Sequence, residues 1–192
     1  MTFKSGLRTI RVTVALLGAA LFSSPPRLVA AMSEELSPNT LAEDAVTEQL
    51  RELRILTGEL NNDADRLNAL VFSRLHWQTH ADNLSEVKDH VNRIGAELGT
   101  LQEMRDTAAP WQQEAIDSII PVVIQVADRT TSAIDHLREN RLGLWVPEYI
   151  DHLRAISTLS DNLHDLLDNH LKMIEARENL QTIEKKLTER VS

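Results

Sequence analysis

The sequence predicts an all-α fold: an elongated antiparallel helical bundle with coiled-coil-like packing, made of three long helices and a shorter first helix. Apolar residues recur at alternating steps of three and four, which keeps one stripe of each helix turned toward a partner. Proline is absent between Asn39 and Ala109, so no proline interrupts a helix there. The prolines after residue 31 are Pro38, Pro110, Pro121 and Pro147. We expect helices at 41–60, 64–106, 110–140 and 147–190.

The boundary between the first two helices depends on a short polar cluster. Thr40 and Glu43 form a capping box at the start of the first helix, each satisfying a backbone N–H of the first turn. The Asn-Asn-Asp run at 61–63 can cap a helix, and we place a turn there. The apolar steps nevertheless continue through Leu60 and Ala64. A single helix over 41–106, or a later turn near Ser73, therefore stays open.

The third and last helices each begin at a proline, at Pro110 and Pro147, since proline suits the first helical position. The β-branched run at 119–127 resembles a strand, but a lone strand with an internal proline has nothing to pair with. We expect a buried helix kinked at Pro121. The apolar seams are Leu84, Val87, Val91, Ile94, Leu98 and Leu101 in the second helix, Ile116, Ile119, Val123, Val126, Thr130, Ala133 and Leu137 in the third, and Leu153, Ile156, Ser160, Leu163, Leu167, His170 and Ile174 in the last.

The first 31 residues have the order of a cleavable secretory signal peptide. A basic start precedes an apolar run at 12–22, and small residues end at Ala31. The run is about half of the roughly 20 residues that a membrane span needs, although an uncleaved anchor is the alternative. We therefore expect a short linker at 32–39, a single bundle domain at 40–192, and a periplasmic or extracellular location.

The charge excludes two classes of partner. The whole chain has 192 residues and a net charge of −9. Removing residues 1–31 removes four basic residues and no acidic one, which leaves 16 basic against 29 acidic residues and a net charge of −13. Such a surface repels phosphate backbones and anionic lipids, so we expect no nucleic acid and no membrane as partner after cleavage. With no cysteine, stability must come from apolar burial.

Helix lengths predict an overhang at the C-terminus. The last helix, at about 66 Å, is about 20 Å longer than the third helix that it packs beside. Residues 178–191 should therefore extend past the bundle. They carry an apolar seam of Leu180, Ile183, Leu187 and Val191, which predicts a protein partner or a homo-oligomer. A frayed, solvated helix end is the alternative.

Histidine is the one candidate for chemistry. His76 and His80 have the i, i+4 spacing of a zinc or copper pair, but a closed site needs two more ligands, and the sequence identifies none. His170 lies on the apolar seam, where a core histidine satisfied by one hydrogen bond is expected. The i, i+4 pairs of Glu86 with His90 and of Glu148 with His152 are typical of surface ion pairs. We expect no metal and no other cofactor.

No catalytic motif is recognisable. Two Glu-x-x-His motifs for a ferritin-like di-iron site, a Cys-x-x-Cys-His haem motif, a Gly-rich phosphate loop and a Gly-x-Ser-x-Gly elbow are all missing from the sequence. Trp111 and Trp145, at opposite ends of the third helix, should plug the ends of the core. Gly95 and Gly99 would permit a close helix crossing. We expect no enzymatic activity.

Three segments resemble uncharacterised bacterial secreted helical-bundle proteins over about residues 70 to 155. They are Trp77-x-x-His80-Ala81, His90-Val91-Asn92-x-x-Gly95 and Pro110-Trp111-Gln112-x-Glu114-Ala115-Ile116. The resemblance implies a bundle and export, assigns no catalytic residue, and draws attention to His80, His90 and Asn92. The expected function is therefore structural: an exported acidic scaffold or holdase-like interaction module. The alternative is a histidine-based zinc- or copper-binding bundle.

Overall fold

The computed structural model describes residues 38–72 and 76–191, and over these residues it contains helices and no strands. The helices are α1 (Pro38–Ala69), α2 (Trp77–Met104), α3 (Pro110–Glu139) and α4 (Pro147–Val191), with 3-10 turns at Leu70–Phe72 and Arg105–Thr107. The all-α prediction is confirmed. The predicted signal peptide, 1–31, and most of the predicted linker lie outside the described residues. No helix in the described ranges is both long and apolar enough to span a bilayer.

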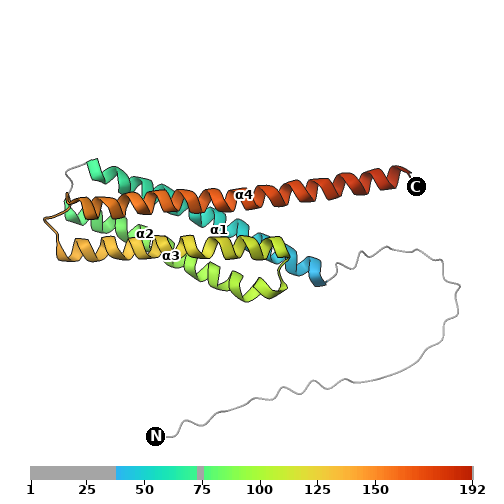
Figure 1. Cartoon of the computed structure of the whole chain (residues 1–192), viewed down its shortest axis with the longest axis horizontal. Helices are drawn as coiled ribbons and strands as arrows, with labels where there is room; N and C mark the ends of the chain where they lie inside the picture. Colours follow the sequence, from blue (N-terminus) through green and yellow to red (C-terminus); the bar gives the residue numbers. More distant parts are fainter. Residues whose placement is uncertain (1–37, 73–75, 192) are drawn as a thin grey trace, which may run out of the picture. The chain divides into compact units, whose positions relative to one another are not determined.

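The four helices pack as neighbours around a common core. α1 packs against α2 and α4, and α3 packs against the same two helices (Figure 1). The connections from α2 to α3 and from α3 to α4 are short, so each reverses the direction of the chain, as in an antiparallel bundle. Each helix therefore has two principal neighbours.

The predicted seams form this core. Every residue of the second and third seams is buried, including Thr130, whose hydroxyl donates to the carbonyl of Val126 at 2.8 Å. α3 continues through Pro121, which faces solvent, where its missing N–H and its ring disturb no packing. On α4 the predicted seam is buried from Leu153 to Ile174, with one exception. His170 is only half-buried, and the next residue, Leu171, is buried in its place. Burial of these side chains supplies the main stabilisation of the bundle, at about 1.5–3 kcal/mol for each large one.

The predicted turn at residues 61–63 is wrong. α1 runs straight through this cluster, because its polar side chains bond to neighbouring helices instead of capping an end. Asn61 donates to Asp161 on α4 at 3.3 Å. Asp63 is 8% exposed, pairs with Arg66, and lies 2.8 Å from Nδ1 of His90 on α2. The later break that the sequence left open, near Ser73, is where α1 and α2 separate. The first helix, at 32 residues, is therefore not the shorter one, since α2 has 28.

The start of α1 also differs from the prediction. The helix begins at Pro38, so residues 38 and 39 belong to it and not to a linker. Thr40 is consequently inside the helix and cannot act as its N-cap. The carboxylate of Glu43 instead accepts a hydrogen bond from the indole Nε1 of Trp111, at 3.3 Å. This contact ties the start of α1 to the start of α3.

One of the two tryptophans predicted to plug the core does not do so. Trp111 is half-buried against the core, but Trp145 is 44% exposed. Tyr149, at 0% exposure, fills that end of the bundle instead. Gly95 and Gly99 mediate no close crossing either, because a Cβ at each position would meet nothing within 4 Å.

Candidate functional site

The described side chains in the C-terminal part of α4 are exposed, although Arg177, Glu178 and Gln181 still border a cleft beside Glu43 and Trp111. Ile174 is the last buried residue of the helix, at 3% exposure, and every side chain from Glu175 to Arg190 is exposed. In Figure 1, α4 continues past the ends of the other helices. We call residues 175–191 the C-terminal extension. It contains the predicted overhang and begins three residues earlier.

An apolar seam runs along this extension. It starts at Met173 and Ala176 and continues through Leu180, Ile183 and Leu187, again at alternating steps of three and four. The exposed fractions of the four large side chains are 52% for Met173, 60% for Leu180, 53% for Ile183 and 56% for Leu187. The side chain of Val191, the last member of the predicted seam, lies outside the described residues. We call Met173, Ala176, Leu180, Ile183 and Leu187 the exposed seam.

The exposed seam does not continue the line of α4 residues that face the bundle. The bundle-facing line of α4 ends with Leu171 and Ile174, and the same steps then reach Glu178, Gln181 and Lys185, which are polar. The exposed seam is offset from that line by two residues, or about 160° around the helix, and so lies near the opposite face of α4. The apolar face of α4 therefore changes direction where the helix leaves the bundle.

The charges of the extension are balanced, although the chain as a whole is acidic. Four acidic and four basic residues lie between positions 175 and 191: Glu175, Glu178, Glu184 and Glu189, and Arg177, Lys185, Lys186 and Arg190. In the heptad set by the exposed seam, Arg177 and Glu184 occupy one flanking row, and Lys172 and Lys186 occupy the other. A partner helix would meet both signs of charge along this surface.

A second group of polar side chains, two of them buried and two half-buried, lies near the start of α4. His80 from α2, His136 from α3, and Tyr149 and His152 from α4 form what we call the imidazole cluster. Nδ1 of His80 lies 3.1 Å from the Tyr149 hydroxyl oxygen. The ring of His136 stacks on that of Tyr149, with centroids 5.3 Å apart and planes inclined by 23°. The cluster joins three helices through a single phenol.

Burial sets the protonation of this cluster. Desolvation lowers the pKa of His80 below the ordinary histidine value of 6.5, and it raises the pKa of Tyr149 well above its usual value. Desolvation also lowers the pKa of His152, assisted by the positive charge of Arg129. His80 is therefore neutral at pH 7, and its Nδ1 and the Tyr149 hydroxyl share one hydrogen bond. Nε2 of His80 is buried and has no hydrogen-bond partner among the described residues.

The structure does not bring His76 and His80 together, although their spacing is that of a zinc or copper pair. His76 precedes α2 in an extended conformation and is exposed, whereas His80 is 1% exposed and bonded to Tyr149. The i, i+4 spacing places two side chains together only inside a helix, and α2 begins at Trp77. Within the described ranges, no three histidine, aspartate or glutamate side chains are placed to hold a metal ion.

The remaining histidines make structural contacts. His170 is half-buried, with Nε2 3.1 Å from the Ser118 hydroxyl, as expected for a core histidine with one partner. His164 lies against Gly58, and its Nδ1 is 3.3 Å from the hydroxyl of Thr57. Each links α4 to a neighbouring helix.

The two histidine–glutamate pairs predicted from spacing have different surroundings in the structure. His90 contacts Asp63 and Glu59 on α1, at 2.8 and 3.4 Å, while Glu86 pairs with Arg66, so the expected Glu86–His90 pair is wrong. His152 belongs to the imidazole cluster, where the charge of Glu148 acts to raise its pKa against the larger opposing effects. Asn92, the third residue that the resemblance emphasised, is exposed on α2.

Sequence reasoning missed the imidazole cluster as a group. Its members come from three helices, and helical spacing relates only residues on one helix. The one available signal was the i, i+3 spacing of Tyr149 and His152, which places both on one face of α4. Comparison of the chain with family models, with curated proteins and with solved structures found no match.

Proposed function

We propose that this protein is an exported, acidic scaffold or holdase-like module that acts by protein–protein contact through its C-terminal extension. The partner that fits this surface best is a second copy of the chain. Export rests on the signal-like order of residues 1–31. The contact rests on one observation: the exposed seam is regular, apolar, and turned away from the line that the bundle buries.

The size of the exposed seam predicts a weak association. Burying the exposed half of a large apolar side chain gives about 1 kcal/mol, and two copies contribute eight such side chains, for about 6–12 kcal/mol in total. Lost translational and rotational freedom opposes association by about 4–15 kcal/mol. The surplus is small, so we expect a dissociation constant of about 10 μM to 1 mM.

The flanking charges favour an antiparallel pair. If two extensions cross between Leu180 and Ile183, each Leu180 meets Ile183 of the second copy. Arg177 then lies opposite Glu184 of the second copy, and the same attractive pair occurs twice. A parallel pair would instead bring Lys172 beside Arg177, which repel each other. Charge pattern and apolar pattern therefore agree on one register.

The test is the molar mass in solution. We would measure the molar mass of the chain lacking residues 1–31 by light scattering, from about 10 μM to 1 mM. The mass should rise with concentration toward twice that of the monomer. A chain that also ends at Arg177 should stay monomeric at every concentration. The double variant Leu180→Ser/Leu187→Ser should do the same, since it keeps the length of the helix and removes two of the four large apolar side chains of the seam.

A matched control variant removes an exposed apolar side chain that is not part of the seam. Ile124 on α3 is 54% exposed, as much as the seam residues, but lies on the bundle. Ile124→Ser should leave the concentration dependence of the mass unchanged. A chain lacking only residues 1–31 that is monomeric at 1 mM would contradict self-association. A dimer that survives loss of the extension would contradict the exposed seam as its contact surface. In the monomeric case, recovery of one protein by the full chain and not by the Leu180→Ser/Leu187→Ser variant would identify a different partner for the same seam.

A further inference from the structure

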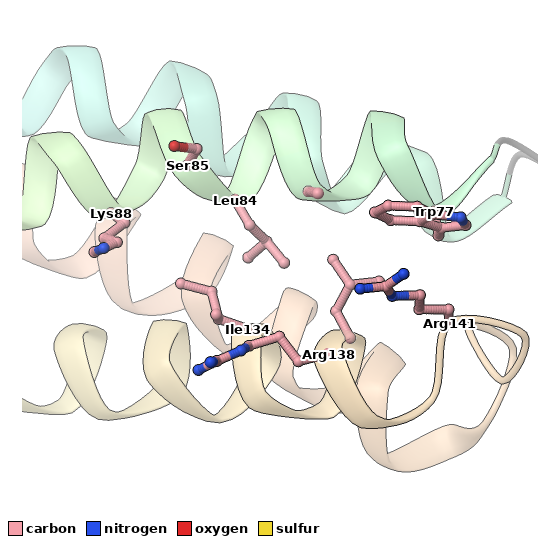
Figure 2. A pocket seen from close by; sticks show the side chains of 9 residues that line it. Trp77, Leu84, Ser85, Lys88, Ile134, Arg138 and Arg141 are labelled. Carbon is pink, nitrogen blue, oxygen red and sulfur yellow. The ribbon is translucent and has the colours of Figure 1, made fainter.

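A cleft of about 210 Å³ opens between α2 and α3, far along the chain from the extension. Its lining combines an apolar floor with a polar rim (Figure 2). The floor residues are Ala81, Leu84, Ile134 and Leu137, and the rim residues are Trp77, Ser85, Lys88, Arg138 and Arg141. The cleft is smaller than the roughly 300–1,000 Å³ of pockets for drug-sized ligands. It therefore fits one short aliphatic chain or a single ring.

The charge of the cleft is opposite to that of the chain. Among the described residues, Lys88, Arg138 and Arg141 line it and no carboxylate does, although the chain has 29 acidic and 20 basic residues. The ion pair of Arg138 with Asp135 spans 3.5 Å, and both side chains are mostly exposed, so it neutralises little of this charge. A concave surface lined by one sign of charge attracts ions of the other sign.

The cations lie at the two ends of the apolar floor. The guanidinium carbon of Arg141 is 4.5 Å from the ring centroid of Trp77, a cation–π contact that holds both side chains at one end. Figure 2 shows Lys88 and the guanidinium of Arg138 toward the other end, with Leu84 between the two ends. An anion bound beside Lys88 and Arg138 would thus have an apolar surface next to it and an aromatic ring beyond.

We propose that this cleft binds an amphipathic monoanion, a carboxylate with a short aliphatic body. The carboxylate accepts hydrogen bonds from Lys88 and Arg138, and such charge-assisted bonds are the strong ones. The aliphatic body covers Leu84 and reaches the ring of Trp77. This binding site is independent of the C-terminal extension, so either proposal can fail without the other.

Three probe molecules test the contributions of the cationic side chains and of the apolar floor separately. Titration calorimetry and tryptophan fluorescence of the chain lacking residues 1–31, at low ionic strength, would measure binding of octanoate, 1-octanol and acetate. Octanoate should bind at least tenfold more tightly than either of the others, because acetate lacks the aliphatic body and octanol lacks the charge. Equal binding of octanol, or no binding of octanoate up to about 10 mM, would overturn the proposal.

Variants place the binding in the cleft. Lys88→Gln/Arg138→Gln should weaken octanoate binding about tenfold or more. Ser85→Phe should weaken it similarly by filling the cleft without changing a charge. Arg154→Gln, which removes an exposed cation from α4, should have no effect. Circular dichroism checks that each variant is folded. Unchanged affinity in the folded double variant would place the binding elsewhere and refute the proposal.

Discussion

The hydrogen bond inside the imidazole cluster makes a quantitative prediction. Tyr149→Phe removes one oxygen from a fully buried side chain and leaves the ring that stacks on His136. Nδ1 of His80 then loses its hydrogen-bond partner, while Nε2 of the same ring already has no partner among the described residues. Leaving a buried donor or acceptor unsatisfied costs about 1–3 kcal/mol. For a domain of this size, each kcal/mol lowers the melting temperature by about 2–4 °C.

Urea unfolding followed by circular dichroism at pH 7.5 measures this loss as a lower free energy of unfolding. The double variant His80→Leu/Tyr149→Phe provides the reference, because replacing both partners by apolar groups leaves nothing unsatisfied. It should be more stable than Tyr149→Phe alone. A Tyr149→Phe protein within about 0.5 kcal/mol of the original, the range of ordinary surface substitutions, would show that the hydroxyl does not hold His80.

Three further predictions concern pH, helix propensity and the seam. The pKa values of His80 and His152 are lowered in the folded state, so unfolding takes up protons. The free energy of unfolding should therefore fall as the pH drops below about 6.5. Urea titrations at pH 7.5 and 5.5 would show this fall, which should be smaller in the variant His152→Asn. An unchanged value between those pH values would contradict the burial of neutral imidazoles. Gly95→Ala should stabilise the fold by about 1 kcal/mol, because a methyl group there meets open space; destabilisation in thermal melts would reveal a helix contact. Arg177→Glu and Glu184→Arg should each weaken dimerisation in sedimentation experiments, and the double variant should restore it; loss in the double variant would reject the antiparallel register.

The sequence predicted the second half of the bundle more accurately than the first half. Pro110 and Pro147 mark the starts of α3 and α4 because proline suits the first helical position, and both helices end within one residue of the expected positions. The turn at 61–63 was misplaced because polar residues that can cap a helix can also bond across helices. Asn61 and Asp63 do the latter, and which use prevails depends on tertiary neighbours.

The candidate sites were predictable only where they lie on one helix. The seam of Leu180, Ile183 and Leu187 follows from spacing alone, since helical geometry places these residues in one line. The cationic cleft and the imidazole cluster combine residues from two and three helices, and spacing along the chain does not set which helices are adjacent. The pair of His76 and His80 failed for a local reason, because the helix begins one residue after His76.

Amide hydrogen exchange along residues 178–190 tests the central claim most directly, because it distinguishes a paired helix from a frayed one. Peptides from this segment should be protected at about 1 mM chain and lose that protection on dilution to about 1 μM. Protection in the bundle peptides of α4, such as 153–171, should not change. Rapid exchange of 178–190 at both concentrations, without any added partner, would show that the extension is a solvated helix end and that the exposed seam does not pair with itself.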